Sequence, residues 1–186
     1  MVDHADTPVQ FVFAGKAHPQ DRTAKQILQD LMSINHESNW QRRAVFIEDY
    51  DQEVARYLVH GVDVWMNVPR RPHEASGTSG MKAAMNGVLN FSILDGWWIE
   101  GYNGTNGFSI GDMRDFQSDE EIDAIEADAL YSSLENEVIP AFYDRDATGL
   151  PTAWIARMKD SIATLTPQFS SDRMVSDYIE RIYTVR

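Results

Sequence analysis

The sequence predicts an α/β fold, in which a parallel sheet carries helices on both faces and further helices follow towards the C-terminus. In the first half of the chain, short apolar runs alternate with segments whose apolar residues recur at helical spacing. Strands that alternate with helices in this way pair in parallel through right-handed crossovers. The runs are almost continuously apolar, which is typical of strands that are covered on both faces of a sheet.

Four segments are expected to form the strands. The first is an apolar run (QFVFA) that ends at Gly15, and the full set is Gln10–Ala14, Arg43–Glu48, Val62–Val68 and Val88–Leu94. Their alternation with helices is typical of a doubly wound parallel sheet. Because four strands make a thin sheet with exposed edges, we expect the chain to be the C-terminal piece of a larger protein.

Three helices are expected between these strands, at Gln20–Ile34, Gln52–Val59 and Thr78–Asn86. After the last strand, the glycine- and asparagine-rich segment Gly96–Gly111 is expected to be a long irregular loop that packs on its tryptophans. Three more helices should follow. They run from Ser118, as the N-cap, to about Glu137, from near Pro151, and from near Ser171.

Composition excludes several classes of function. The chain has 16 basic and 29 acidic residues, a formal net charge of −13, which argues against binding to nucleic acids or to anionic membranes. It has no cysteine, which excludes disulfides and thiol nucleophiles, and its five histidines show no metal-binding spacing, so no metal site is expected. No signal-peptide pattern is visible at the N-terminus, and we expect a cytoplasmic protein.

The segment Pro69–Gly87 carries the strongest chemical signal. A strand ends, a turn bounded by prolines follows, and small residues lead into a helix. The first N–H groups of a helix are unpaired and can hold an anion. Thr78 adds a hydroxyl, and Lys82 lies one turn further along the same face. An amine beside a phosphate cradle suggests pyridoxal phosphate, which a lysine binds as a Schiff base. The alternative is an ordinary helix with a surface lysine.

The string EASGTSGMKAAMNG (Glu74–Gly87) resembles the cofactor-lysine segment of the α-glucan phosphorylases, which act on glycogen, starch and maltodextrin. The likeness to the bacterial short-form members covers the chain from about Phe11 to its end. It includes FAGKAHPQD, VFIEDYD, GVDVWMNVPRRP, LNFSILDGWWIEGYNGTNGFSIG and FYDRDATGLPTAWIARMKDSIATLTPQF. The resemblance implies the C-terminal portion of a two-domain glycosyltransferase architecture. Residues 1–111 would be a partial Rossmann-like cofactor-binding region, and residues 112–186 a helical region that packs on it.

The resemblance also implies roles for single residues. Lys82 would be the catalytic lysine, which holds pyridoxal 5'-phosphate. Gly77 and Thr78 would contact the cofactor phosphate, and Tyr50 would lie near the cofactor.

A second set of residues would bind the substrate. Glu74 would accept hydrogen bonds from hydroxyls of the glucosyl unit, and Ser76 and Gly77 would bind them through the backbone. A carboxylate is a suitable partner for sugar hydroxyls.

The reaction that the resemblance implies is the phosphorolysis of an α-1,4-glucan by inorganic phosphate to give α-D-glucose 1-phosphate. In this family the cofactor phosphate takes part in proton transfer. Members are several times longer than this chain, and the basic segment that binds the substrate phosphate in them has no counterpart here. We therefore expect the missing N-terminal phosphorylase domain to be a partner, the chain alone to be inactive, and a homodimer to be possible.

Two rival hypotheses remain. The chain could be a non-catalytic remnant of a phosphorylase that binds the cofactor or a sugar without chemistry. It could also belong to a nucleotide-sugar glycosyltransferase of similar architecture, which would carry no cofactor on Lys82.

Three further features have more than one interpretation. Trp97 and Trp98 are expected in the core, although they could stack on sugar rings. The acidic run Asp119–Asp128 is interpreted as a solvated helix face. Asp51 places an acid close to the expected phosphate site, where it would repel the phosphate.

Overall fold

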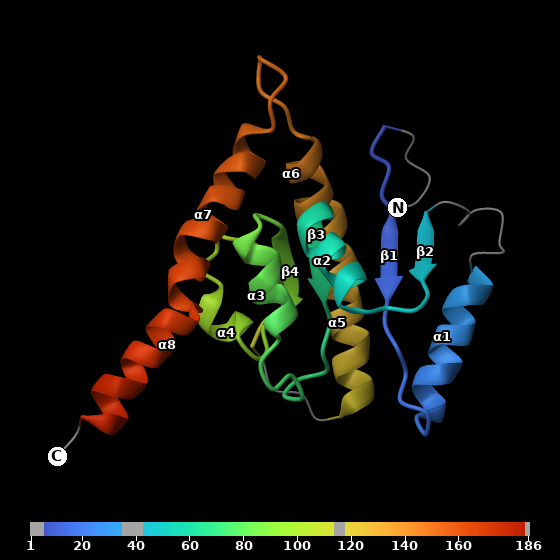
Figure 1. Cartoon of the computed structure of the whole chain (residues 1–186). Helices are drawn as coiled ribbons and strands as arrows, with labels where there is room; N and C mark the ends of the chain where they lie inside the picture. The colour runs from blue at the N-terminus through green and yellow to red at the C-terminus, as the bar shows by residue number, and fades with distance from the viewer. Residues whose placement is uncertain (1–5, 35–42, 114–117, 185–186) are drawn as a thin grey trace. The chain divides into compact units, whose positions relative to one another are not determined.

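A computed structural model describes residues 6–34, 43–113 and 118–184 of the chain (Figure 1). The chain divides into two compact units, Met1–Tyr57 and Leu58–Arg186, which are described separately below. This division by compactness differs from the one that the resemblance implies, in which a cofactor-binding region ends at residue 111. The latter stays a prediction.

The first unit is built on a pair of parallel strands. Strand β1 (Phe11–Ala14) is followed by helix α1 (Arg22–Ile34) and strand β2 (Ala44–Ile47). The two strands pair in parallel, with Phe11 opposite Ala44. A helix between two parallel strands is the expected crossover, so this part of the predicted pattern is confirmed.

Helix α2 (Gln52–Gly61) starts after β2 and explains the acid at position 51. The Asp51 carboxylate accepts a hydrogen bond from the Val54 backbone N–H, at 2.9 Å. An aspartate at this position caps the first turn of a helix and favours its positive end. Asp51 therefore has a structural role in starting α2.

The second unit contains a sheet of three parallel strands in the order β3–β4–β5. These are β3 (Val64–Asn67), β4 (Leu89–Ile93) and β5 (Phe108–Ile110). Every residue of the central strand β4 is buried. A strand covered on both faces needs an almost continuous apolar sequence, and this confirms the predicted fold class of a parallel sheet with helices around it.

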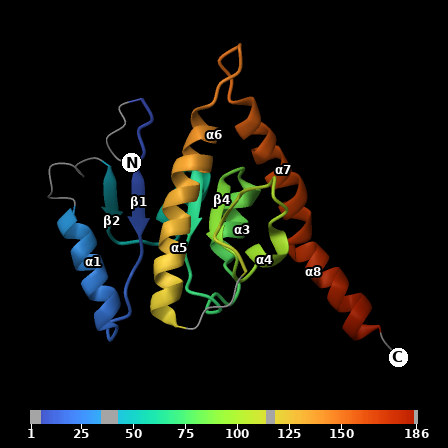
Figure 2. The same cartoon turned by 180° about the vertical axis from the view of Figure 1, so that it is seen from behind.

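Helices surround this sheet. Helix α3 (Thr78–Met85) packs on β3 and β4, and α5 (Asp119–Ser133) packs on β5. Figure 1 shows α3 in front of the sheet, and Figure 2, from behind, shows α5 in front of it. The other helices are α4 (Trp98–Gly101), α6 (Ile139–Tyr143), α7 (Thr152–Gln168) and α8 (Ser171–Tyr178), with π-helical turns η1 (Leu134–Val138) and η2 (Ile179–Tyr183).

The N-cap predicted at Ser118 is confirmed. Its hydroxyl oxygen accepts a hydrogen bond from the Glu121 backbone N–H at 3.2 Å, which satisfies one of the free donors of the first turn of α5. The helix does not stop near Glu137, however, because η1 and α6 continue it to Tyr143. Pro140 lies in the first turn of α6, where proline is tolerated.

The strands of each unit pair among themselves, β1 with β2 in the first unit and β3, β4 and β5 in the second, and β5 is a strand that the sequence did not predict. The prediction for the segment Gly96–Gly111 was wrong in part, because it is not an irregular loop throughout and contains α4 and β5. Both elements are too short to show a period in a sequence rich in glycine and asparagine.

The core of the second unit is built around the two tryptophans. Trp97 and Trp98 are 4% and 0% exposed, and they form a cluster with Ala84 and Leu165. The Trp98 indole N–H donates a hydrogen bond to the Phe108 carbonyl at 3.3 Å, so its one polar atom is satisfied. Both rings are therefore core residues, as expected, and not platforms for a sugar.

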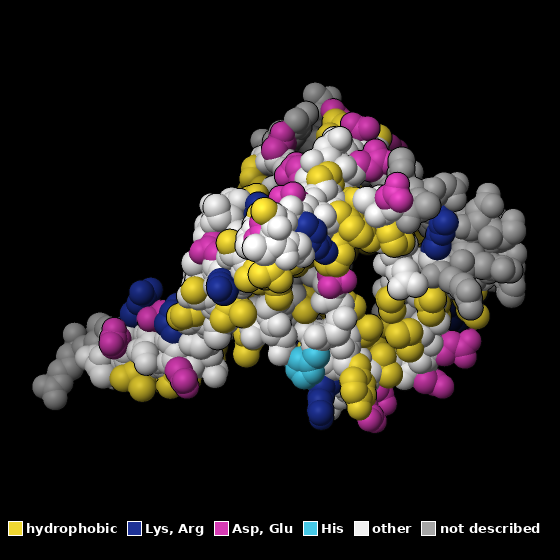
Figure 3. All heavy atoms as spheres, turned by 90° about the horizontal axis from the view of Figure 1, so that it is seen from above, with side chains coloured by type: hydrophobic (Ala, Val, Ile, Leu, Met, Phe, Trp, Pro, Cys, Tyr) yellow, Lys and Arg dark blue, Asp and Glu magenta, His cyan; other side chains and the backbone are white. Residues whose placement is uncertain are grey.

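Hydrophobic side chains are also exposed at several places on the face that Figure 3 shows. The C-terminal helical segment is a clear case, with Ile182 61% and Tyr183 75% exposed. Apolar surface of this kind is usually covered by contacts with further protein. Within the described residues, no helix has both the length and the apolar character that crossing a bilayer requires.

Candidate functional site

The candidate site lies where two neighbouring strands of the second unit end. Strands β3 and β4 are paired in parallel, with Asn67 opposite Ser92. The segment from Pro69 to Gly77 follows β3, and the segment Asp95–Trp97 follows β4. Because parallel strands point the same way, both segments leave the sheet at its carboxyl edge, which is where ligands bind in open α/β sheets.

Gly77 forms the entry to helix α3. Its φ angle is +92°, a left-handed conformation that favours glycine, and a Cβ there would lie 2.8 Å from Trp97 Cδ1. The N–H groups of Thr78 and Ser79, the first two of the helix, have no hydrogen-bond partner among the described residues. Unpaired donors at the positive end of a helix attract an anion.

Thr78 and Lys82 lie on the exposed side of α3, one turn apart. Within the described part of the chain, neither the Thr78 hydroxyl nor the Lys82 amine makes a hydrogen bond or ion pair. The buried side of α3 consists of Gly80, Ala83 and Ala84. The helix therefore packs on the unit through small residues and presents a free hydroxyl at its first residue and a free amine one turn further along.

Close packing fixes the height of α3 above the sheet. A Cβ on Gly80 would lie 2.5 Å from Asn90 Oδ1 on β4, and the Asn90 amide donates a hydrogen bond to the Gly80 carbonyl at 3.0 Å. Both residues are buried. Asn90 thus satisfies its polar side chain inside the sheet by holding the first turn of the helix.

Glu74 and Ser76 are held against the neighbouring segment Asp95–Trp97. The Glu74 backbone N–H donates to Asp95 Oδ2 at 2.9 Å, and the Ser76 carbonyl accepts from the Trp97 N–H at 2.8 Å. The Glu74 carboxylate reaches towards α3, since its Oε1 lies 3.5 Å from where a Cβ on Gly77 would be. The second unit therefore brings together Glu74, Ser76, Gly77, Thr78 and Lys82, while their individual roles remain predictions.

Tyr50 belongs to the first unit. It follows β2 and is partly buried. Its expected place near the cofactor stays a prediction.

Sequence reasoning missed the segment Asp95–Trp97 as part of the site. Asp95 is only 6% exposed, and Gly96 adopts a φ of +52°. The available signal was an acid followed by glycine directly after a strand parallel to the one that precedes the site. Such a pair of residues marks a turn at the edge where ligands bind.

The acidic run at the start of α5 was interpreted as a solvated face, and this is wrong for one of its carboxylates, Glu126, which is only 9% exposed, whereas Asp119 and Asp123 are 64% and 56% exposed. Arg70 pairs with Asp119 and Asp123, with hydrogen bonds of 3.0 Å to each. Arg71 pairs with Glu126 at 3.1 Å, and these two side chains are 12% and 9% exposed. The start of the site segment is therefore attached to α5 by charged pairs, one of them nearly buried.

The Arg70 contacts also affect its ionisation. The hydrogen bond and charge of Asp123 raise the pKa of the Arg70 guanidinium above its ordinary value, with smaller contributions from Asp119 and Glu120. Because Arg70 is exposed, these ion pairs add little to the stability of the fold. Their main effect is to orient the start of the segment Pro69–Gly77 relative to α5.

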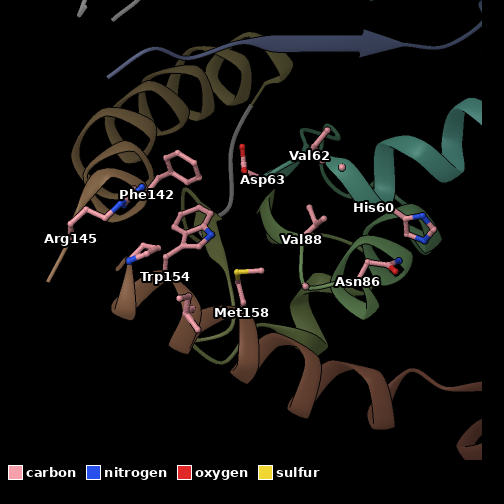
Figure 4. Close-up of a pocket in the computed structure, with 13 residues that line it drawn as sticks. His60, Val62, Asp63, Asn86, Val88, Phe142, Arg145, Trp154 and Met158 are labelled. Carbon is pink, nitrogen blue, oxygen red and sulfur yellow. The ribbon is translucent and has the colours of Figure 1, made fainter. Parts of the chain in front are cut away.

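A cavity of about 350 Å³ lies elsewhere in the second unit (Figure 4). Phe142 from α6 and Trp154 and Met158 from α7 line it, together with Asp63 and Val88, which directly precede β3 and β4. It is thus at the amino ends of the strands, opposite the candidate site, and none of the predicted site residues lines it. We therefore do not assign it to the reaction.

Comparison with known families decides the relationship. The sequence profile of the carbohydrate phosphorylases matches residues 2–106, more than half of the chain. The chain belongs to the carbohydrate phosphorylase family. The expected family resemblance is therefore confirmed.

Individual phosphorylases match almost the whole chain. A glycogen phosphorylase from Aquifex aeolicus is 50% identical over 184 residues, which cover 99% of this chain and 26% of the relative. A maltodextrin phosphorylase from Thermococcus litoralis is 47% identical over 99% of this chain and 22% of the relative. A glycogen phosphorylase from Mycobacterium tuberculosis is 43% identical over 95% and 20%. The chain thus spans about a quarter or less of the length of these phosphorylases.

Proposed function

We propose that this chain is the cofactor-carrying part of an α-1,4-glucan phosphorylase. In the reaction, inorganic phosphate cleaves the terminal α-1,4-glucosidic bond of a glucan, and the products are α-D-glucose 1-phosphate and a glucan shorter by one unit. The observation that supports the proposal most directly is the start of α3. There, the Glu74 carboxylate lies beside Gly77, the first N–H groups of the helix and the Thr78 hydroxyl have no partner among the described residues, and the free Lys82 amine follows one turn along the helix.

The residues present fit pyridoxal 5'-phosphate. Gly77 leaves no room for a side chain, and the N–H groups of Thr78 and Ser79 are available to a phosphate together with the Thr78 hydroxyl. The Lys82 amine is available to the aldehyde. When bound, the cofactor supplies a phosphate group that takes part in proton transfer to the substrate phosphate.

The Glu74 side chain fits the role of a sugar ligand. Its carboxylate has no hydrogen-bond or salt-bridge partner among the described residues, whereas its backbone is fixed. An ionised carboxylate accepts hydrogen bonds from sugar hydroxyls, and it does so more strongly than a neutral group. The backbone at Ser76 and Gly77 would bind further hydroxyls of the same glucosyl unit.

The remainder of the active site would come from the rest of the phosphorylase. The partners that we propose are an α-1,4-glucan, inorganic phosphate or glucose 1-phosphate, and the N-terminal phosphorylase domain. A homodimer and a cytoplasmic location stay predictions.

A chimera tests the proposal. This chain is placed in the Aquifex aeolicus glycogen phosphorylase in exchange for the matching segment, to which it is 50% identical. We expect the chimera to form glucose 1-phosphate from glycogen and phosphate. Glu74→Gln should lower kcat/KM by about 100-fold, because charge-assisted hydrogen bonds of roughly 2–3 kcal/mol in total are weakened.

Glu180→Gln, an exposed position on η2, is the matched control and should leave kcat/KM unchanged. A folded chimera that forms no glucose 1-phosphate would count against the proposed function. A chimera in which Glu74→Gln behaves like the control would show that Glu74 is not a sugar ligand.

A further inference from the structure

We propose that Asp95 is a positioning residue for Glu74. Its buried carboxylate holds the Glu74 backbone and so sets where the Glu74 side chain presents its own carboxylate to the glucosyl unit. The inference rests on the proposed function for the identity of the sugar, while the contact between the two residues is a property of the structure alone.

Both oxygens of the Asp95 carboxylate are used. Oδ2 accepts from the Glu74 N–H and Oδ1 accepts from the Gly96 N–H, each at 2.9 Å. With 6% exposure, Asp95 has little access to water, so these two N–H groups are the main compensation for its burial. Hydrogen bonds from backbone N–H groups to an ionised carboxylate are among the stronger ones in proteins.

The next two residues fix the same neighbour. A Cβ on Gly96 would lie 2.6 Å from the Ser76 carbonyl oxygen and 2.8 Å from Glu74 Cγ. The Trp97 N–H donates to that Ser76 carbonyl at 2.8 Å. Glu74 and Ser76 therefore lie directly against the segment Asp95–Trp97, with no space between them for a side chain.

The backbone and the side chain of Glu74 differ in how they are held, and this difference indicates that Asp95 positions Glu74 and does not only stabilise the fold. Its backbone is tied to a buried carboxylate, yet its side-chain oxygens make no hydrogen bond or ion pair with any described residue. A side chain that is free at its tip and fixed at its base is the arrangement that a preorganised binding site needs. Asp95 supplies the fixed base.

Asp95→Asn tests this with little change of shape. Asparagine keeps one acceptor oxygen but turns the other into an amide that donates, so one of the two N–H groups loses its partner. In the chain itself, we expect hydrogen exchange at the Glu74 or Gly96 amide to become at least about tenfold faster. Reductive labelling of Lys82 with pyridoxal phosphate should be unchanged.

Asp63→Asn is the control. Asp63 is exposed at the amino end of β3, and its carboxylate has no partner among the described residues, so exchange at Glu74 should stay as in the parent chain. Asp95→Ser, which also keeps one oxygen acceptor, replaces Asp95→Asn if that variant does not fold, and it carries the same expectations.

A double-mutant cycle in the chimera provides the readout that a purely structural role would not give. We expect Asp95→Asn to lower kcat/KM by about tenfold when Glu74 is present, and to have no further effect once Glu74→Gln is in place. Unchanged amide exchange at both Glu74 and Gly96, or losses that simply add, would overturn the proposal. If Glu74→Gln alone has no effect, the proposed sugar site fails, whereas the exchange experiment still decides whether Asp95 holds Glu74.

Discussion

Replacing Gly96 by alanine is expected to destabilise the second unit by about 3 kcal/mol. The residue has a φ of +52°, which costs a non-glycine residue roughly 1 kcal/mol. A Cβ would also lie 2.6 Å from a backbone oxygen, that of Ser76, which cannot move aside as a flexible side chain would. Forcing atoms into such a contact costs a further 1–3 kcal/mol or so. Denaturant unfolding followed by near-ultraviolet circular dichroism measures the loss.

Gly104→Ala separates the two contributions. Gly104 also has a positive φ, of +92°, but no atom of the described residues lies within 4 Å of its Cβ position. It should therefore cost only the conformational part, about 1 kcal/mol. If the two variants lose equal stability, the close approach of Gly96 to Ser76 is not a feature of the folded protein, and the site geometry described above is wrong.

Replacing Trp98 by alanine is expected to cost about 4 kcal/mol, as the loss of a fully buried tryptophan does in other cores. Trp98 is 0% exposed, packs with Trp97 and Tyr102, and donates its indole N–H to the Phe108 carbonyl. A domain of this size is stable by only about 5–15 kcal/mol, so a large part of its stability would be lost. The melting temperature of the second unit should fall accordingly.

Tyr131→Ala is the matched control for this variant. Tyr131 is an aromatic residue of the same unit, on α5, and is 56% exposed. Its removal should change stability by about 0.5 kcal/mol or less. A Trp98→Ala chain that melts like Tyr131→Ala would mean that the tryptophans do not form the core and are free for another role, such as stacking on a sugar.

The sequence predicts most of the fold because local signals agree with the packing. Strand β4 is buried on both faces, and its almost continuous apolar sequence predicts this. Ser118 is predicted to be an N-cap from its residue type, and its hydroxyl accepts a hydrogen bond from the Glu121 backbone N–H. Strand β5 carries no such signal, because it has only three residues and lies within a glycine-rich segment. It is a strand because it pairs in parallel with β4. Its presence depends on tertiary pairing that no local window contains.

The same difference applies to the site. Glu74, Gly77, Thr78 and Lys82 stand close together in the sequence, so their chemistry can be predicted from one segment. Asp95 comes next to Glu74 only because β3 and β4 are neighbours in the sheet. The pairing of Arg71 with Glu126 likewise joins residues that are far apart in the chain, which is why the acidic run was predicted to be solvated.

The lysine to which pyridoxal phosphate attaches in this chain shows directly whether the start of α3 forms the cofactor site. The purified chain is incubated with pyridoxal phosphate and reduced with borohydride, which makes the link to a lysine permanent, and the added mass is located by peptide mapping. Lys82→Arg should remove the label, whereas Lys159→Arg, an exposed lysine on α7, should not. We expect a single, stoichiometric label at Lys82. A label spread over Lys16, Lys25 and Lys159, or no label at all, would contradict the claim that the start of α3 in this chain forms the cofactor site.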